Sequence, residues 1–230
     1  MITIDELQSR ATSNRWLRYF AVFCRVALAL GFIPSGIVKI MGERFTALPN
    51  NHPLGHYLEA LHHTGFYYPF VGVVQLGTAV LLLIPRTALL GALIYFPFIT
   101  NIVVLAYATR FEGTRITTFM LMANLFLLFW DYDRLKHILP FKQSSKALEK
   151  KKVISNKFPF AFFGVVIGVL VTVVIVNHFL YDVRPGNMKL ECTNGCAGNR
   201  NPKACYDFCN CIYDQGGTLD KCLEEYEEAK

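Results

Sequence analysis

Charged residues are scarce in this chain, and acidic residues are scarcer than basic ones. Asp, Glu, Lys and Arg together make up 17% of the 230 residues, against about a quarter in a typical soluble domain. The formal net charge is +6, but the basic residues lie between apolar runs and form no patch interleaved with aromatic residues. We therefore interpret them as signals of membrane topology and expect no nucleic acid among the partners of the protein.

We also expect no cleavable signal peptide at the N-terminus. Asp5 and Glu6 precede the first basic residues, and the apolar run that follows is longer than the core of a signal peptide and lacks an A-x-A site. We expect this first apolar segment to remain as an uncleaved membrane anchor.

Several motifs for metal or cofactor chemistry are missing. The chain has no C-x-x-C pair, the usual spacing of a redox dithiol, and no C-x-x-C-H, which excludes attachment of a c-type haem. It has no H-E-x-x-H and no cysteine spacing typical of zinc sites. We expect no metal site and identify no cofactor, although a quinone is left open. The sequence also has no internal repeat, which gives a transporter little support.

Long apolar runs dominate what is present. Hydrophobic residues make up 53% of the chain, and a run of roughly 20 of them spans a bilayer core. Tyr and Trp residues lie at the ends of the runs, where amphipathic rings are favoured. The predicted fold class is an all-α, polytopic membrane helix bundle with five spans, over residues 16–38, 67–84, 87–108, 116–130 and 158–181.

The distribution of Lys and Arg predicts the orientation of these spans. Basic residues gather before the first span, at Arg86 between the second and third, and in the linker 140–157 before the fifth. With five spans all three regions fall on one side, which should be cytoplasmic. The N-terminus is then inside and the C-terminus outside.

Six of the seven cysteines lie after the last predicted span, on the side predicted to be outside. An even number of cysteines in a short extracytoplasmic segment predicts a disulfide framework, so the topology and the redox compartment agree. We predict a disulfide-stapled helical hairpin within residues 182–230 and leave open which of the fifteen pairings forms. The six residues are Cys192, Cys196, Cys205, Cys209, Cys211 and Cys222.

The loop after the first span carries a polar helical face. His56, Glu59 and His63 share one side of a predicted amphipathic helix. We expect this helix to lie on the extracytoplasmic surface of the membrane that the bundle spans. They could converge on a metal or handle protons, but their spacing matches no strong ligand signature. We favour a solvated polar face.

Polar side chains inside the spans are candidates for a functional pocket. Arg25 is the strongest, because an ionisable residue within a membrane is costly and normally finds a partner in the bundle; snorkelling to the cytoplasmic headgroups is the alternative. Gln75, Asn101 and Asn124 could line one pocket with it, or simply bond between helices. We expect Lys39 to snorkel outward.

The first four spans resemble the DoxX-like family of four-helix membrane proteins. The resemblance rests on Arg25, the run from Gly31 to Lys39, and Gln75-Leu76-Gly77 leading to Pro85-Arg86-Thr87-Ala88-Leu89-Leu90. It covers about residues 16–139 and implies a bundle in a bacterial inner membrane. The family includes proteins resembling a subunit of a thiosulfate:quinone oxidoreductase and a membrane protein needed for maturation of a disulfide-rich enzyme.

These observations predict four regions and leave two functional hypotheses. The regions are a DoxX-like bundle (1–139), a basic cytoplasmic linker (140–157), a fifth transmembrane helix (158–181) and a periplasm-facing Cys-rich domain (182–230). In the first hypothesis the protein is a non-enzymatic membrane component whose bundle binds a lipid, a quinone or a partner helix, and whose tail docks a membrane or periplasmic protein. In the second it is a quinone-linked thiol or sulfur oxidoreductase, or its membrane subunit. The missing C-x-x-C and cofactor motifs favour the first.

Overall fold

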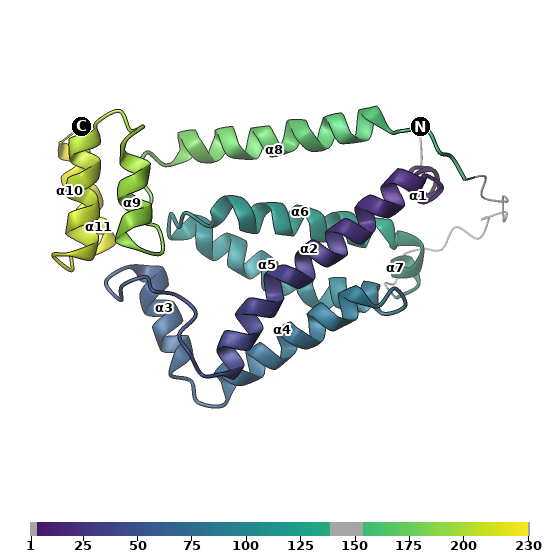
Figure 1. Ribbon diagram of the computed structural model, residues 1–230, viewed down its shortest axis with the longest axis horizontal. Coiled ribbons are helices and arrows are strands. Elements are labelled where there is room, and N and C mark those ends of the chain that lie inside the picture. Colours follow the sequence, from purple (N-terminus) through teal and green to yellow (C-terminus); the bar gives the residue numbers. More distant parts are fainter. Residues whose placement is uncertain (1–3, 139–153, 230) are drawn as a thin grey trace.

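A computed structural model describes residues 4–138 and 154–229, and the regular elements of this part of the chain are all α-helices, with one isolated β-bridge between Asn14 and Ser155 (Figure 1). Positions 140–153 of the predicted basic linker lie outside the described residues. The helices are α1 (Ile4–Thr12), α2 (Arg15–Ile40), α3 (Pro53–His62), α4 (Tyr67–Leu83), α5 (Ala88–Ala108), α6 (Thr114–Trp130), α7 (Tyr132–Ile138), α8 (Phe160–Leu180), α9 (Lys189–Cys196), α10 (Pro202–Tyr213) and α11 (Leu219–Glu228).

Three of these helices are long and apolar enough to cross a membrane: α2, α5 and α8. The helices α3 and α4 would together count as a fourth, but the chain bends by 98° between them. The helix α6 is apolar but has only 17 residues. The chain therefore has the character of a membrane protein with three to four candidate spans by length and composition.

Small residues allow the helices α2 and α4 to cross closely. A Cβ atom added at Gly72 of α4 would stand 2.7 Å from the Gly36 carbonyl oxygen of α2, and one added at Gly36 would stand 3.0 Å from the Gly72 carbonyl oxygen. Glycine at these facing positions lets the two backbones touch, as in small-residue packing of membrane helices. Gly91 has the same role where α5 crosses α4, because its Cβ would meet the Leu82 backbone nitrogen at 2.8 Å.

Apolar side chains of α2, α4, α5 and α6 fill the centre of the bundle. Phe32 and Tyr95 stack with their ring centroids 3.8 Å apart, and both are almost completely buried. Leu28, Leu82 and Ile99 complete this centre. The long apolar periodicity of the sequence therefore produces a packed four-helix core.

The helix α8 lies to one side of this core. Asn177 is its one buried residue, and it donates to the Tyr107 hydroxyl at 3.1 Å. At the other end of α8, Phe162 and Phe163 pack on Phe20 of α2. The rest of the α8 surface is exposed apolar side chains, which a lipid environment suits.

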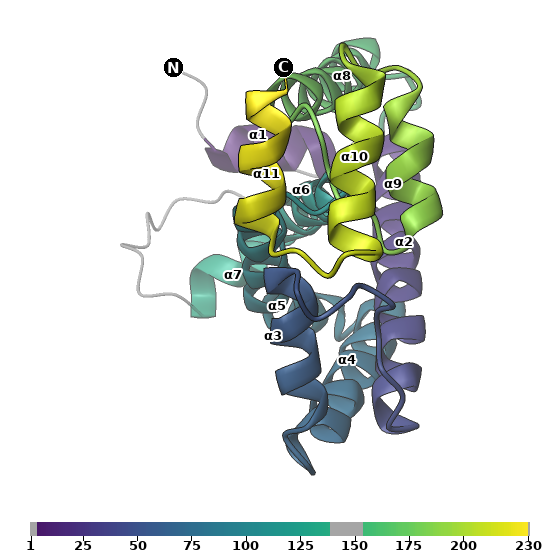
Figure 2. The same ribbon diagram turned by 90° about the vertical axis from the view of Figure 1, so that its left-hand side faces the viewer.

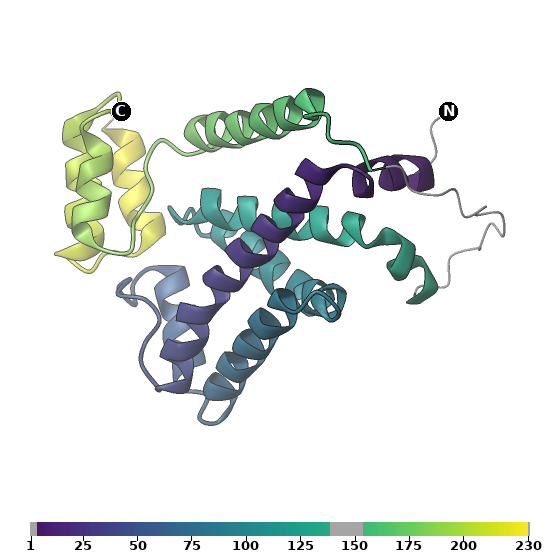
Figure 3. The ribbon, with the colours of Figure 1, turned by 45° about the vertical axis from the view of Figure 1, so that its right-hand side comes forward.

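The two ends of the molecule carry different elements (Figures 1 and 3). One end, which we call the N-terminal end, holds α1, α7 and the start of α8, and Lys136 links α7 to α1 through an ion pair with Asp5 at 3.0 Å. The opposite end, the cysteine end, holds α9, α10 and α11 beside α3 (Figure 2). There Asn51 donates to the carbonyl oxygens of Ile212 (2.9 Å) and Gly217, which joins the loop before α3 to the Cys-rich domain.

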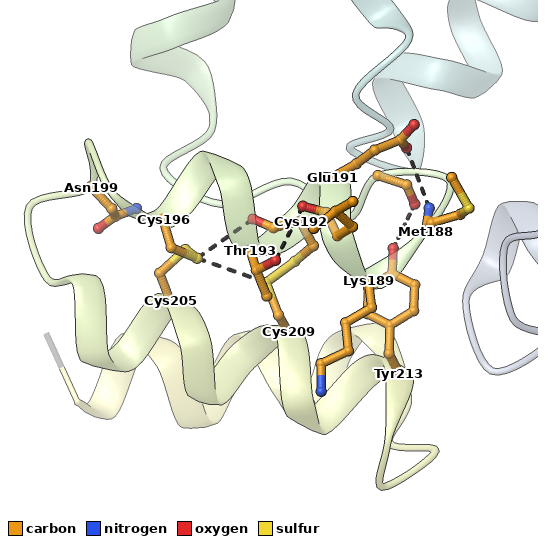
Figure 4. The surroundings of a disulfide bond; sticks show 12 residues. Met188, Lys189, Glu191, Cys192, Thr193, Cys196, Asn199, Cys205, Cys209 and Tyr213 are labelled. Atoms are coloured by element: carbon orange, nitrogen blue, oxygen red, sulfur yellow. Dashed lines mark hydrogen bonds between the residues drawn. A yellow bond between two sulfur atoms is a disulfide. The ribbon is translucent and has the colours of Figure 1, made fainter.

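Three disulfides hold the Cys-rich domain together, and Figure 4 shows the surroundings of the two that join α9 to α10. Cys192–Cys209 and Cys196–Cys205 join α9 to α10, and Cys211–Cys222 joins α10 to α11. The prediction of a disulfide framework is confirmed, and the two helices of the predicted hairpin are present as α10 and α11, which Cys211–Cys222 joins; the helix α9 was not predicted. The segment has three helices, because α9 presents Cys192 and Cys196 to the matching pair on α10 and is held by those two bonds.

Candidate functional site

A cavity of about 430 Å³ opens at the N-terminal end of the bundle. We call it the Arg25 cavity. Its polar lining comes from α1, α2, α7 and the residue that ends α6: Gln8, Thr12, Arg18, Arg25, Asp131, Asp133 and Arg134. Trp130 and the apolar face of α2 form the rest of the wall.

Arg25 has an acidic partner in this cavity. Its Nη2 lies 3.5 Å from Oδ2 of Asp131, the C-cap residue of α6, and both side chains are only 14% exposed. Arg134, one helical turn further on, lies 3.8 Å from the other oxygen of the same carboxylate. Burial raises the pKa of Asp131, and the two arginines oppose that shift. Arg25 is thus paired within the bundle, the first of its two predicted alternatives.

Two buried polar atoms in the cavity have no hydrogen-bond partner within the described part of the chain. They are Nε of Arg25 and Oε1 of Gln8. Gln8 is 3% exposed and donates from Nε2 to the Trp130 carbonyl oxygen at 3.0 Å. Since buried polar atoms are normally satisfied, unused donor capacity at Arg25 indicates room for an acceptor such as a phosphate or carboxylate oxygen.

The other predicted pocket residues lie elsewhere. Gln75 accepts from the Ser35 hydroxyl at 3.2 Å, Asn124 donates to the Ala92 carbonyl oxygen at 3.1 Å, and Asn101 is exposed. None of the three lines the Arg25 cavity. Gln75 and Asn124 have the interhelical bonding role that we weighed for them.

Lys39 is buried instead of snorkelling outward. It is 5% exposed, and its Nζ donates to the Ser35 hydroxyl at 2.6 Å and carbonyl oxygen at 3.2 Å. The ammonium also lies 4.3 Å from the centroid of the Phe45 ring. The loop after α2 folds back over the end of the helix, so the side chain finds its partners inside the protein.

One carboxylate, that of Glu59, contacts two other charged or polar side chains on and beside the polar face of α3. Glu59 forms an ion pair with Arg44 at 2.9 Å and a hydrogen bond with His63 at 3.0 Å. The His63 hydrogen bond lowers the pKa of Glu59, with Arg44 adding to the effect. His56 is exposed on the same helix.

His52 is a buried titratable residue that sequence reasoning missed. It is the N-cap of α3, and its Nδ1 accepts from the Leu54 backbone N–H at 3.2 Å. Its side chain is fully buried, and burial lowers its pKa to about 4. The sequence His52-Pro53 could have identified the start of α3, because Pro at the first helical position is typical of a helix start.

Comparison with known proteins places the chain in a family. Over 131 residues the chain is 34% identical to Uncharacterized protein YwoB of Bacillus subtilis (strain 168), a match that spans 52% of this chain and 80% of that protein. The chain belongs to the YwoB family. No family model and no solved structure matches it.

The name of the YwoB relative gives no activity. We therefore infer what this chain can do chemically from its own residues. All six cysteines of the tail are paired, and Cys24 is buried and free. Three sulfur atoms, those of Cys196, Cys205 and Cys209, lie within 4.8 Å of one another. They belong to disulfides, so they are not available as thiolate ligands for a metal.

Proposed function

We propose that this YwoB-family chain is a non-enzymatic component of a bacterial inner membrane, built on a five-span DoxX-like bundle. The Arg25 cavity binds the headgroup of an anionic lipid, and the Cys-rich domain docks an extracytoplasmic protein. One observation carries the lipid part of this proposal: a cavity at a helix-bundle end with three arginines, one of which is buried with an unused donor.

The charge balance of the Arg25 cavity supports an anionic ligand. Arg18, Arg25 and Arg134 face Asp131 and Asp133, and Asp133 is also bonded to Lys136 at 2.8 Å. A phosphate diester would accept from the guanidinium groups, which match its geometry. At the cytoplasmic surface, anionic lipids supply such groups at high local concentration.

Support for five spans comes from helix lengths and directions. The 17 residues of α6 extend about 25 Å at ~1.5 Å per residue, which a slightly thinned bilayer accommodates. Successive long helices run alternately away from and toward the N-terminal end (Figure 3). Five crossings put the Cys-rich domain on the oxidising side, which its disulfides require.

The surface of the Cys-rich domain supports a protein partner with a basic face. Its C-terminal helix α11 exposes Asp220, Glu224, Glu225, Glu227 and Glu228, whereas the rest of the chain is basic. Opposite charges on a partner would steer association and fix its orientation.

Lipid retention by the purified full-length protein tests the lipid-binding proposal. The protein is released from nanodiscs that contain equal amounts of phosphatidylglycerol and phosphatidylcholine, and bound lipids are counted by native mass spectrometry. We expect preferential retention of phosphatidylglycerol and a loss of about tenfold in Arg25→Gln, since each charge-assisted bond contributes about 1.5–3 kcal/mol. The matched control is Arg86→Gln, an exposed residue outside the cavity. Equal retention of both lipids by the wild-type protein would refute the proposal.

A quinone-linked thiol oxidoreductase is the second candidate, favoured by the packing of two disulfides. The Cys196 and Cys209 sulfur atoms, which belong to different disulfides, lie 3.8 Å apart. Once a donor has reduced one of the two bonds, attack of a released thiolate on the other disulfide would need little movement and would release a thiolate from that bond. Under this alternative a pair of tail thiols accumulates when quinone turnover is blocked.

A further inference from the structure

A second cavity, of about 240 Å³, lies at the cysteine end between the bundle and the Cys-rich domain. We call it the Glu112 cavity. The start of α6 and the turn before it form one wall of this cavity. The end of α8, the segment 181–184 that follows it and the helix α9 form the others. The charged residues that carry the argument are Glu112, Arg115, Arg184 and Glu191.

These four side chains form two like-charged pairs. Burial and the neighbouring Arg115 lower the pKa of Arg184, which Glu112 opposes, while burial and the neighbouring Glu191 raise the pKa of Glu112, which Arg184 and Arg115 oppose. The two carboxylates meet beside Gly186: one oxygen of each lies 2.9 Å from the point where a Cβ of that residue would stand. The cavity therefore holds two carboxylates that meet at one point and two guanidinium groups near them.

Two of the four groups lack a direct partner. Within the described residues, no hydrogen bond and no ion pair within 4 Å joins Glu112 or Arg115 to another side chain; Glu112 is exposed, whereas the Nε atom of Arg115 is buried and unsatisfied. The other two are held in place. Glu191 accepts from the Asn187 backbone N–H at 2.5 Å, and Arg184 donates to the Asn177 carbonyl oxygen at 2.6 Å.

The surroundings of the Glu112 cavity suit a lipid. Tyr181 lies at the end of the apolar helix α8 and donates to the Tyr107 carbonyl oxygen at 2.8 Å, as interfacial aromatic residues do at headgroup level. Phe179 and Leu180 are exposed beside it. An acyl chain can lie along this exposed apolar surface while its headgroup enters the cavity.

We propose that the Glu112 cavity binds the zwitterionic headgroup of an aminophospholipid, with its phosphate on Arg115 and Arg184 and its primary ammonium on Glu112 and Glu191. A single small headgroup that carries both charges can pair with the two arginines and with the two carboxylates. A purely anionic headgroup would leave the two carboxylates facing a negative charge. This site is at the opposite end from the Arg25 cavity and does not rest on the function proposed for that cavity.

Headgroup methylation tests the assignment in the full-length protein. Binding is measured by native mass spectrometry after titration with phosphatidylethanolamine or phosphatidylcholine of identical acyl chains. Both headgroups carry a phosphate and a positive charge, but choline has no N–H to donate to the carboxylates. We expect phosphatidylethanolamine to bind about tenfold more tightly, and Glu112→Gln to reduce this preference at least threefold. The matched control Glu224→Gln changes an exposed glutamate of α11 and should leave the preference unchanged.

Two further arms make the result decisive. Arg115→Gln should weaken binding of both lipids, while the control Arg200→Gln, which changes an exposed arginine of the Cys-rich domain, should weaken neither. Water-soluble glycerophosphoethanolamine should bind at least a hundredfold more weakly than the intact lipid. Equal affinity for the two lipids would overturn the headgroup assignment. Equal affinity for the soluble headgroup would overturn the assignment to a lipid.

Discussion

Arg25, in the first long helix, and Asp131, at the end of the fourth, form an ion pair 3.5 Å apart at the floor of the Arg25 cavity. Each side chain is 14% exposed, so the pair is shielded from solvent on most sides. The carboxylate holds Arg25 within the bundle and leaves part of its guanidinium free for a ligand.

The substitution Asp131→Asn tests this relationship. It leaves the Arg25 charge largely buried with no counter-ion, and breaking a buried pair costs about 3–5 kcal/mol, with a smaller loss here because some solvent reaches the pair. We expect a clearly lower midpoint of thermal unfolding in detergent. The control Asp220→Asn, which changes an exposed residue of α11, should leave the midpoint unchanged. An unchanged midpoint for Asp131→Asn would disprove a structural ion pair.

The glycine contact between α2 and α4 gives a second prediction. Gly72→Ala places a methyl group 2.7 Å from a backbone oxygen, so the helices must move apart at a cost of about 1–3 kcal/mol. Gly77→Ala, in the same helix, meets nothing within 4 Å and should be neutral or stabilising. Chemical unfolding of the two variants separates these effects, and equal stabilities would show that the close crossing does not form.

His52 predicts a specific acid sensitivity. Its pKa in the folded protein is about 4, below the unfolded value of about 6.5, so the folded state favours the neutral ring. Stability from this residue is complete above about pH 6.5 and falls as the pH drops toward 4, by about 3 kcal/mol in total. The variant His52→Asn keeps an N-capping oxygen but does not titrate. Its free energy of unfolding should fall less between pH 7 and pH 4 than that of the wild type; identical slopes would argue against a buried neutral His52.

The sequence was sufficient for the helical membrane character and the disulfide framework, because both depend on local pattern. Long apolar runs define helices, and an even set of cysteines after the last run indicates pairing. It was not sufficient for α9, whose segment Lys189–Cys196 contains Asn194 and Gly195 and has no apolar stripe. That helix is held by two disulfides to the next helix, α10.

The candidate sites were harder to predict from the sequence, because they depend on contacts between residues in different elements. Arg25 was identified by its position inside an apolar run, but its partner Asp131 lies beyond the fourth helix and nothing local connects the two. Lys39 was misjudged because its burial depends on the fold of the loop that follows it. Gln75 and Asn124 were candidates to line a pocket with Arg25, with bonding between helices as the alternative, and each bonds a different helix.

Thiol trapping in intact cells tests the central claim, a non-enzymatic bundle with an oxidised extracytoplasmic domain. Cells are quenched with acid, and free thiols are tagged with a maleimide of known mass before and after quinone turnover is blocked. The account predicts one tag per chain in both states, on Cys24, with the pairs Cys192–Cys209, Cys196–Cys205 and Cys211–Cys222 recovered by peptide mapping. Accumulation of a second and third tag when quinone is blocked would contradict it in favour of the oxidoreductase, and seven tags in untreated cells would show that the topology is inverted.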